Sequence, residues 1–395
     1  MALWKIIIYT HQVVAIMEDE LINQRFEISL QVLTPLSIGA GAEYDWVKGV
    51  DFVVKGGKLY HLNLHKIEQA GINIENLTNA FAQKDAESLL RYLGNRLDSV
   101  TDAVFNMPCN SDNDIKAFLH NQFTGHPVVA GSSLKGAIRS VLFTYLRDKQ
   151  RYNDEVFGRM NDGTDFMRFI RVSDFEFEKT DLVNTKIYNL HTDNRHNWLG
   201  GWKHNFRNGT NTSFSPTGFN TIYECLMPSS EVQGSIMLSK KLFELLTQHG
   251  PKQPCFYKKK ELFYHVGNDK YGKNKISPIE NLFYQINLHT KDYLEKELLF
   301  FTKFNQGENC DRIIDSIKHL TSQVKTCIDN GDSCILKMAA GTGFHSITGD
   351  WQYNDYSNTR YWEKGKDKGK KKYKSRKIAI NGKQFTLMGF VKLSK

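Results

Sequence analysis

A glycine-serine-serine turn that leads into a helical pattern is the feature that most constrains the fold of this chain. A short apolar run at residues 127–130 precedes the turn at residues 131–133. From residue 134 to about residue 147, apolar side chains recur at spacings of three and four, which predicts a helix with one buried stripe made of Leu134, Ile138, Val141, Leu142 and Tyr145. This stripe requires other elements to pack against the helix.

Two cations lie beside this stripe at the start of the predicted helix. Lys135 and Arg139 are four residues apart, so they share a face. The positive end of a helix dipole favours acidic side chains, so two cations here indicate an anion from outside the helix. Backbone amides after Gly131 and the hydroxyls of Ser132 and Ser133 would complete a phosphate-binding turn. In the alternative interpretation a serine caps the helix and both cations are solvated.

Strand and helix patterns are mixed along the rest of the chain. The 395 residues are 40% hydrophobic, which is enough for two or three domains. Strands are predicted at residues 26–36, 50–64, 166–178, 221–226, 232–238 and 378–387, and helices at 75–97, 114–119, 239–249 and 310–330. The mixture lacks a regular βα alternation, which predicts an α+β fold. We place a boundary near Pro228, which gives domains 1–230 and 231–395, with an N-terminal extension over residues 1–22.

The positive charge of the chain is concentrated in one segment. The formal net charge is +9, but residues 364–377 hold nine basic residues and one acid, so nine minus one leaves +8 there and about +1 elsewhere. Gly365 and Gly369 predict that this basic loop is flexible. Such a loop attracts nucleic acid without holding it specifically. A solvated loop that contacts nothing is the alternative.

Residues 184–216 combine cations and aromatic rings without a regular period, so they are predicted to form an inserted loop. The residues concerned are His191, Arg195, His196, Trp198, Trp202, Lys203, His204 and Arg207. Binding of single-stranded RNA uses this combination, because bases stack on rings and phosphates meet cations. A protein interface and an unstructured loop remain alternatives.

No catalytic residue, metal site or cofactor is predicted. His61 and His65 are four residues apart, but the residues around His61 alternate as in a strand, which separates the two imidazoles. The histidines at residues 191–204 are irregularly spaced, and only Asp193 lies close enough to act as an acidic partner. General acid–base cleavage of RNA needs two groups placed together, and no sequence pattern pairs them.

Two further features bear on the cellular compartment. Residues 4–17 are apolar but contain Lys5 and His11, lack a cleavage site and are too short to span a bilayer, so neither a signal peptide nor a membrane segment is predicted. The six cysteines include no C-x-x-C pair, which argues against a zinc ribbon or a dithiol redox site. We expect a cytoplasmic protein with reduced thiols.

Four short motifs occur in an order and spacing that are typical of one protein family. Residues 131–139, GSSLKGAIR, match a G-S-S-x-K-G-x-x-R signature, and residues 33–41, LTPLSIGAG, match an LTPLHIGSG opening with Ser37 where His is common. The others are RVSD at 171–174, and a glycine loop at 341–344 with a closing strand at 389–393. The chain therefore resembles the RAMP superfamily of CRISPR systems. Over about residues 26–395 it is most similar to the Csm subunit that caps the 3′ end of crRNA in type III-A effector complexes.

This resemblance implies two ferredoxin-like, RRM-like RAMP domains with inserted loops. It implies a non-catalytic subunit that binds the 3′ portion of crRNA and supports crRNA maturation in antiviral defence. The implied partners are crRNA, the repeated RAMP backbone subunit, the small subunit of the Csm complex and, indirectly, target RNA. The RNA-binding residues would be Gly39, Ala40, Gly41, Gly131, Ser132, Ser133, Lys135, Arg139, Lys337, Gly341, Thr342, Gly343 and His345.

Two alternatives remain within the same superfamily. One is a RAMP endoribonuclease that processes CRISPR repeats, and the other is a RAMP subunit of a type III-B complex. In related filament subunits an aspartate in an early loop assists target cleavage, and Asp45 lies near that place. The capping subunit is not regarded as the target-cleaving one, so catalysis is not expected.

Overall fold

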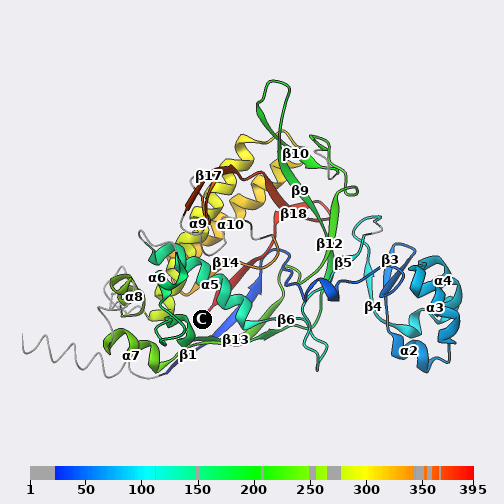
Figure 1. The fold of residues 1–395 in the computed structure, drawn as a ribbon, viewed down its shortest axis with the longest axis horizontal. Coiled ribbons are helices and arrows are strands. Elements are labelled where there is room, and N and C mark those ends of the chain that lie inside the picture. The colour runs from blue at the N-terminus through cyan, green and yellow to red at the C-terminus, as the bar shows by residue number, and fades with distance from the viewer. Residues whose placement is uncertain are drawn as a thin grey trace, which may run out of the picture.

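The computed structural model has an α+β fold, with helices and antiparallel sheets mixed as predicted (Figure 1). It describes residues 23–111, 113–147, 152–205, 209–248, 255–264, 277–341, 343, 351–353, 358–363 and 366–395. The extension predicted over residues 1–22 lies outside these ranges. Among the helices of the described residues, none combines the length and the apolar character that crossing a lipid bilayer requires.

A five-stranded antiparallel sheet forms the first core. In order, its strands are β14 (Ser333–Lys337), β20 (Phe390–Ser394), β1 (Gln24–Val32), β13 (Glu231–Leu238) and β7 (Ile170–Val172). The core also contains α5 (Gly131–Leu146), α7 (Lys240–Gln248), α8 (Phe256–Tyr264) and the first turns of α9 (Pro278–Lys303). This sheet combines strands from both sides of the boundary placed at residue 230, and the division into two domains there stays a prediction.

A seven-stranded sheet forms the second core. Its strands are β11 (Thr210–Asn211), β10 (Trp198–Lys203), β9 (Asp181–Thr192), β12 (Asn220–Cys225), β5 (Ile115–Lys116), β18 (Ser375–Asn381) and β19 (Gln384–Leu387). β9 is central, because it pairs with β10, β12 and β18. The later turns of α9 and the helix α10 (Cys310–Asn330) pack on one face of this sheet, and Figure 1 shows the two helices beside it.

The prediction of an inserted loop at residues 184–216 is wrong for most of that segment. β9 and β10 form a long antiparallel pair, and the fully buried Trp202 packs edge-on against Tyr188 with 5.3 Å between the ring centroids. Gly200 is required here, because a Cβ atom would overlap the carbonyl oxygen of Phe304. Glycines at core positions hide the period-two pattern that otherwise identifies a strand.

A smaller unit projects from one end of the molecule (Figure 1). It consists of β2 (Phe52–Lys55), β3 (Lys58–Leu62) and β4 (Thr101–Asn106), with α2 (Leu64–Gln69), α3 (Ile74–Gln83) and α4 (Ala86–Leu93). The predicted hairpin is confirmed, since Gly56 and Gly57 turn with φ of 58° and 75°. The helical stretch predicted at residues 75–97 is interrupted, because Lys84 ends α3 in the left-handed conformation.

The basic segment at residues 364–377 is not a flexible loop where the structure describes it. β17 (Lys366–Lys372) pairs with β16 (Asn358–Glu363), which in turn pairs with β15 (Trp351–Tyr353), and β18 begins at Ser375. Residues 364 and 365 lie outside the described ranges. Lysine repeats and glycine indicate a loop by composition, but backbone pairing across three strands outweighs that tendency.

The remaining elements are short. They are β6 (Val128–Val129), β8 (Phe175–Glu176), α6 (Asn153–Phe157), and the 3-10 helices η1 (Ala42–Tyr44), η2 (Gly94–Arg96), η3 (Asp98–Val100) and η4 (Phe166–Phe169). The helix predicted at residues 114–119 is wrong, since this segment contains β5 and bridges to Trp46 and Gly39. The predicted helices at 239–249 and 310–330 are confirmed as α7 and α10, whereas α9 was not predicted.

A buried ion pair joins α9 to β18. The guanidinium Nε of Arg376 donates to the Glu297 carboxylate at 2.7 Å, and both side chains are at most 2% exposed. The guanidinium also lies 3.8 Å from the ring centroids of Phe300 and Tyr373. Because isolated buried charges are strongly destabilising, each member of this pair needs the other.

We expect Glu297→Gln to lower the free energy of unfolding by about 3–5 kcal/mol, because it leaves the Arg376 charge buried without its counter-ion. Glu295→Gln on the same helix is the matched control, since Glu295 forms only an exposed pair with Lys291 and should change stability by less than about 1 kcal/mol. Urea denaturation of both variants measures the difference. Equal effects would show that the buried pair does not stabilise the contact between α9 and β18.

Candidate nucleic-acid interface

One face of the sheet around β9 is left uncovered by α9 and α10. Successive side chains of a strand point to opposite faces, and the face that carries Asn184, Lys186 and Tyr188 is fully buried. On the other face Val183, Thr185, Cys225 and Ala379 are buried as well, but five neighbouring residues are only partly buried. The strand register places these residues on it, and we call them the open face: Lys116, Ile187, Thr221, Tyr223 and Lys377.

Two cations and an aromatic ring meet on the open face. The Lys377 ammonium contacts the Tyr223 hydroxyl and lies 4.4 Å from the centroid of its ring. Lys116, next to Tyr223 in the sheet, forms an ion pair with Asp45, whose hydrogen bond raises the pKa of Lys116 above its ordinary value. Lys116 is therefore cationic at neutral pH. A ring between two ammonium groups is suited to a nucleobase and its flanking phosphates.

The first predicted glycine loop borders this face. Ser37 accepts a hydrogen bond from the Ala340 amide at 3.0 Å, and Gly39 forms a bridge with Phe118, two residues after Lys116. Gly41 has a φ of 125°, which residues with a side chain rarely adopt. The loop at residues 39–41, Gly-Ala-Gly, therefore lies at the edge of the open face, as a phosphate-contacting loop should.

The second predicted glycine loop lies at the same edge. Gly341 has a φ of 78°, and a Cβ atom placed on it would lie 3.8 Å from the Cβ of Lys377. Gly343 also has a positive φ, of 69°. Thr342 and His345, which were predicted to contact RNA, lie outside the described residues. The structure thus brings together two glycine loops that are far apart in the sequence.

Lys337, by contrast, is a core residue. Its side chain is buried at 6% exposure, its Nζ donates to the carbonyl oxygen of Met388 at 2.7 Å, and it lies 4.9 Å from the Phe390 ring centroid. Burial lowers the pKa of Lys337 to about 8. The prediction that Lys337 contacts RNA is contradicted, because its ammonium is directed at protein groups.

The start of α5 already has an anion. The helix begins at Gly131, and its amide donates to a carboxylate oxygen of Asp174 at 2.7 Å. The N-cap residue is Ala130, so the alternative in which Ser132 or Ser133 caps the helix is wrong. Asp174 is the last residue of the RVSD motif, so two of the family motifs contact each other here.

The two cations of α5 belong to a separate cluster. Arg139 pairs with Asp165 at 3.2 Å and stacks 3.9 Å from the ring centroid of Phe157. Burial lowers the pKa of Lys135, although the nearby Asp165 opposes this shift. The structure therefore supplies an internal carboxylate where the sequence indicated an external phosphate. RNA contact by Lys135 and Arg139 stays a prediction, without support from this geometry.

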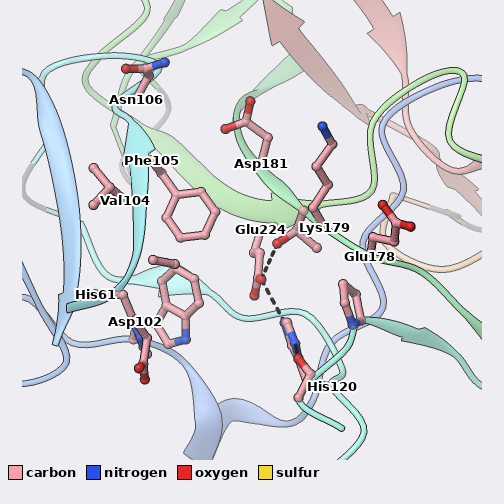
Figure 2. A pocket seen from close by; sticks show the side chains of 15 residues that line it. His61, Asp102, Val104, Phe105, Asn106, His120, Glu178, Lys179, Asp181 and Glu224 are labelled. Atoms are coloured by element: carbon pink, nitrogen blue, oxygen red, sulfur yellow. Dashed lines mark hydrogen bonds and ion pairs between the residues drawn. The ribbon is translucent and has the colours of Figure 1, made fainter. Parts of the chain in front are cut away.

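A histidine and a glutamate form a second polar arrangement (Figure 2). The buried Glu224 carboxylate accepts hydrogen bonds from the Phe118 amide, the Thr180 hydroxyl and the His120 ring, at 2.7, 2.6 and 2.8 Å. The other ring nitrogen of His120 contacts the carbonyl oxygen of Gly125 at 2.8 Å. Burial alone would lower the pKa of His120, but the hydrogen bond to Glu224 and its charge outweigh burial and raise it.

Both ring nitrogens of His120 face acceptors, so both carry protons and no lone pair is available to a general base. Within the described ranges, no group of three His, Cys, Asp or Glu side chains is placed to hold a metal ion. Asp45, the candidate for assisting target cleavage, is engaged by Lys116.

Comparison with protein-family models identifies the chain. Residues 29–328 match the model described as the RAMP superfamily, so the chain belongs to that superfamily. The resemblance carried by the four motifs is thereby confirmed, as is the predicted α+β fold class with ferredoxin-like RAMP domains. A comparison with curated protein sequences finds no significant match.

One solved structure shows the same fold, and a second aligns with the chain less well. A chain in the cryo-EM structure of a Csm–crRNA–target RNA ternary complex of a type III-A CRISPR-Cas system aligns with a TM-score of 0.57 at 15% identity, over 93% of this chain and 100% of that chain. The crystal structure of T. onnurineus Csm5 aligns with a TM-score of 0.49 at 13% identity, over 79% of this chain and 90% of that chain.

Sequence reasoning missed Lys116 and Tyr223 of the open face. Lys116 lies in a strand of only two residues, and Tyr223 and Lys377 come from strands far apart in the chain. One signal was present: Lys377 is the last residue of the basic segment 364–377, which was predicted to attract nucleic acid. That Lys377 lies beside Tyr223 could not be found without the strand register.

The contact between Gly131 and the RVSD strand makes a testable pair of substitutions. A Cβ at residue 131 would overlap the carbonyl oxygen of Val172, so we expect Gly131→Ala to destabilise the protein by about 1–3 kcal/mol. Gly136 in the same helix has no atom within 4 Å of such a Cβ, so Gly136→Ala should stabilise by about 0.5–1 kcal/mol. Urea denaturation compares them, and destabilisation of similar size in both would refute the close approach at Gly131.

Proposed function

We propose that this protein is a non-catalytic RNA-binding subunit of a type III-A Csm effector complex, where it binds and caps the 3′ portion of crRNA. The observation that carries the proposal is the open face, on which Lys116, Tyr223 and Lys377 are bordered by two glycine loops. Contacts to phosphates and to the flat faces of bases carry no sequence preference, as a protein that holds many different guides requires.

The distribution of charge supports the same function. Outside residues 364–377 the chain has a net charge of about +1, so electrostatic attraction from the rest of the chain adds little RNA affinity. A neighbouring subunit that already holds the RNA would raise the effective concentration of the next nucleotides at the open face. This suits a subunit that caps one end of an assembled filament. The fold shared with a chain of a type III-A Csm–crRNA–target RNA complex agrees with this assignment.

We expect the double substitution Lys116→Gln and Lys377→Gln to weaken binding of single-stranded RNA about tenfold at low salt. If each lysine meets one phosphate, the slope of log affinity against log salt should fall by about 0.7 per contact, because fewer counterions are released. Fluorescence anisotropy of a labelled RNA across a salt series measures both quantities.

The matched control is Lys318→Gln with Lys325→Gln, which removes the same charge from exposed positions of α10. This control should leave the salt slope unchanged, since α10 packs on the opposite face of the sheet. An unchanged slope in the variant of the open face, or an equal loss in the control, would count against the open face as the RNA site.

The capping role predicts how the protein behaves in its host. A tagged copy should be recovered with crRNA and RAMP backbone partners, and photo-crosslinks to the crRNA should map to its 3′ portion. The purified chain should not cleave repeat RNA in Mg²⁺ or Mn²⁺. Recovery as a free monomer, crosslinks confined to the 5′ portion, or cleavage that persists in EDTA would each contradict the proposal, and recovery with type III-B subunits would assign the chain to that complex.

A further inference from the structure

A cavity of about 790 Å³ lies on the side of β12 opposite the open face. Side chains alternate along β12, so Tyr223 points to the open face while its neighbour Glu224 lines the cavity. Figure 2 shows β4 of the small unit on one side of the cavity and residues 178–181 on the other. No part of the proposed RNA contact uses this space.

One wall of the cavity is aromatic and uncharged. Trp46 and Phe105 have ring centroids 5.6 Å apart at an interplanar angle of 36°. His61 packs on Trp46 with 4.4 Å between the centroids. Burial lowers the pKa of His61, so the imidazole is neutral near pH 7. The wall therefore offers flat π surfaces without a positive charge of its own.

The rest of the lining is polar, and its charges do not balance. Four carboxylates line the cavity: Asp102, which lies on β4 with Phe105, and Glu178, Asp181 and Glu224 from other segments. The three cations that accompany them are Lys179 on the wall, the His120 imidazolium on Glu224, and Lys66, which pairs with Asp102 at 2.9 Å. Four negative charges minus three positive ones leave one net negative charge.

Two of these carboxylates can still accept hydrogen bonds from a bound ligand. One oxygen of Asp181 accepts from the Leu182 amide at 2.8 Å, and within the described residues the Glu178 carboxylate has no hydrogen bond or ion pair. Both residues are exposed, and Figure 2 shows them on the side of the cavity away from Phe105. A planar cation on the aromatic wall would therefore face carboxylate oxygens across the cavity.

We propose that this cavity binds the guanidinium group of an arginine side chain from a partner protein. A guanidinium stacks on aromatic rings and donates in-plane hydrogen bonds to carboxylates, which are the two features that the opposite walls provide. Its single positive charge neutralises the single net negative charge of the site. A lysine ammonium lacks the plane, and a phosphodiester would add a second uncompensated negative charge.

The position of the cavity is compatible with simultaneous RNA binding. Because the cavity and the open face lie on opposite sides of β12, a protein partner can occupy one while RNA occupies the other. The inference depends on the cavity alone, so a failure of the proposed crRNA role would leave it standing.

Isothermal titration of the full chain with argininamide, lysinamide and cytidine monophosphate tests the proposal. Argininamide should bind with a dissociation constant in the millimolar range, lysinamide about fivefold more weakly, and the nucleotide not measurably. The double substitution Glu178→Gln with Asp181→Asn should weaken argininamide about tenfold. Phe105→Leu should also weaken it, by about threefold, through loss of stacking.

The control is the double substitution Glu87→Gln with Asp98→Asn, which removes the same charge from exposed positions outside the cavity. This variant should bind argininamide with the affinity of the unsubstituted chain. Equal affinity for argininamide and lysinamide would overturn the proposal, as would tighter binding of the nucleotide or an unchanged affinity in the Glu178 and Asp181 variant. Self-association that argininamide competes away, measured by light scattering, would make a second copy the occupant and would overturn the assignment to a different protein.

Discussion

The alternation of side chains along β9 and its neighbouring strands is the constraint on which the rest of the structure depends. α9 and α10 pack on one face, where Tyr188 and Ile378 are fully buried. On the opposite face Val183, Cys225, Ala379 and Met388 form a small buried cluster, and beside it Lys116, Tyr223 and Lys377 stay partly exposed. The proposed RNA contact thus depends on the part of this face that neither the two helices nor the small cluster covers.

Of the two long helices, α10 was predicted from the sequence and the 26-residue α9 was not, and short or glycine-containing strands were also missed. The helix α10 shows its apolar stripe over 21 residues, so its bounds follow directly from the spacing. β10 carries Gly200 and Gly201 at buried positions, where the backbone of another segment approaches too closely for a side chain. β5 has two residues, too few to show any period. In both strands the tertiary contact, not the local pattern, determines the element.

At the candidate site, positions that need an unusual backbone conformation were easier to predict than the ion-pair partners of the charged residues. Gly41 and Gly341 have the positive φ that glycine permits, and a hydrogen bond from the Ala340 amide to the Ser37 carbonyl oxygen joins their two loops. The sequence also shows that the α5 cations need an anion, but spacing does not reveal whether that anion comes from outside. Asp165 supplies it to Arg139 from within the chain, and Asp174 accepts from the Gly131 amide at the start of the helix. A charged residue without a partner in the sequence pattern therefore indicates that a counter-ion is needed, and only the fold shows which group provides it.

Glu224 connects the cavity on one side of β12 with the segment that carries Lys116 on the other. Its carboxylate accepts from the amide of Phe118, which lies two residues after Lys116, and from His120 beyond it. The same carboxylate that lines the acidic cavity thus holds the segment that presents a cation on the open face. Because a buried carboxylate with three hydrogen bonds has little freedom to move, Glu224 acts as a fixed part of the framework. The exposed Glu178 and Asp181 are not held by such a set of hydrogen bonds, so a guest at the proposed cavity site would not displace Lys116 from the open face.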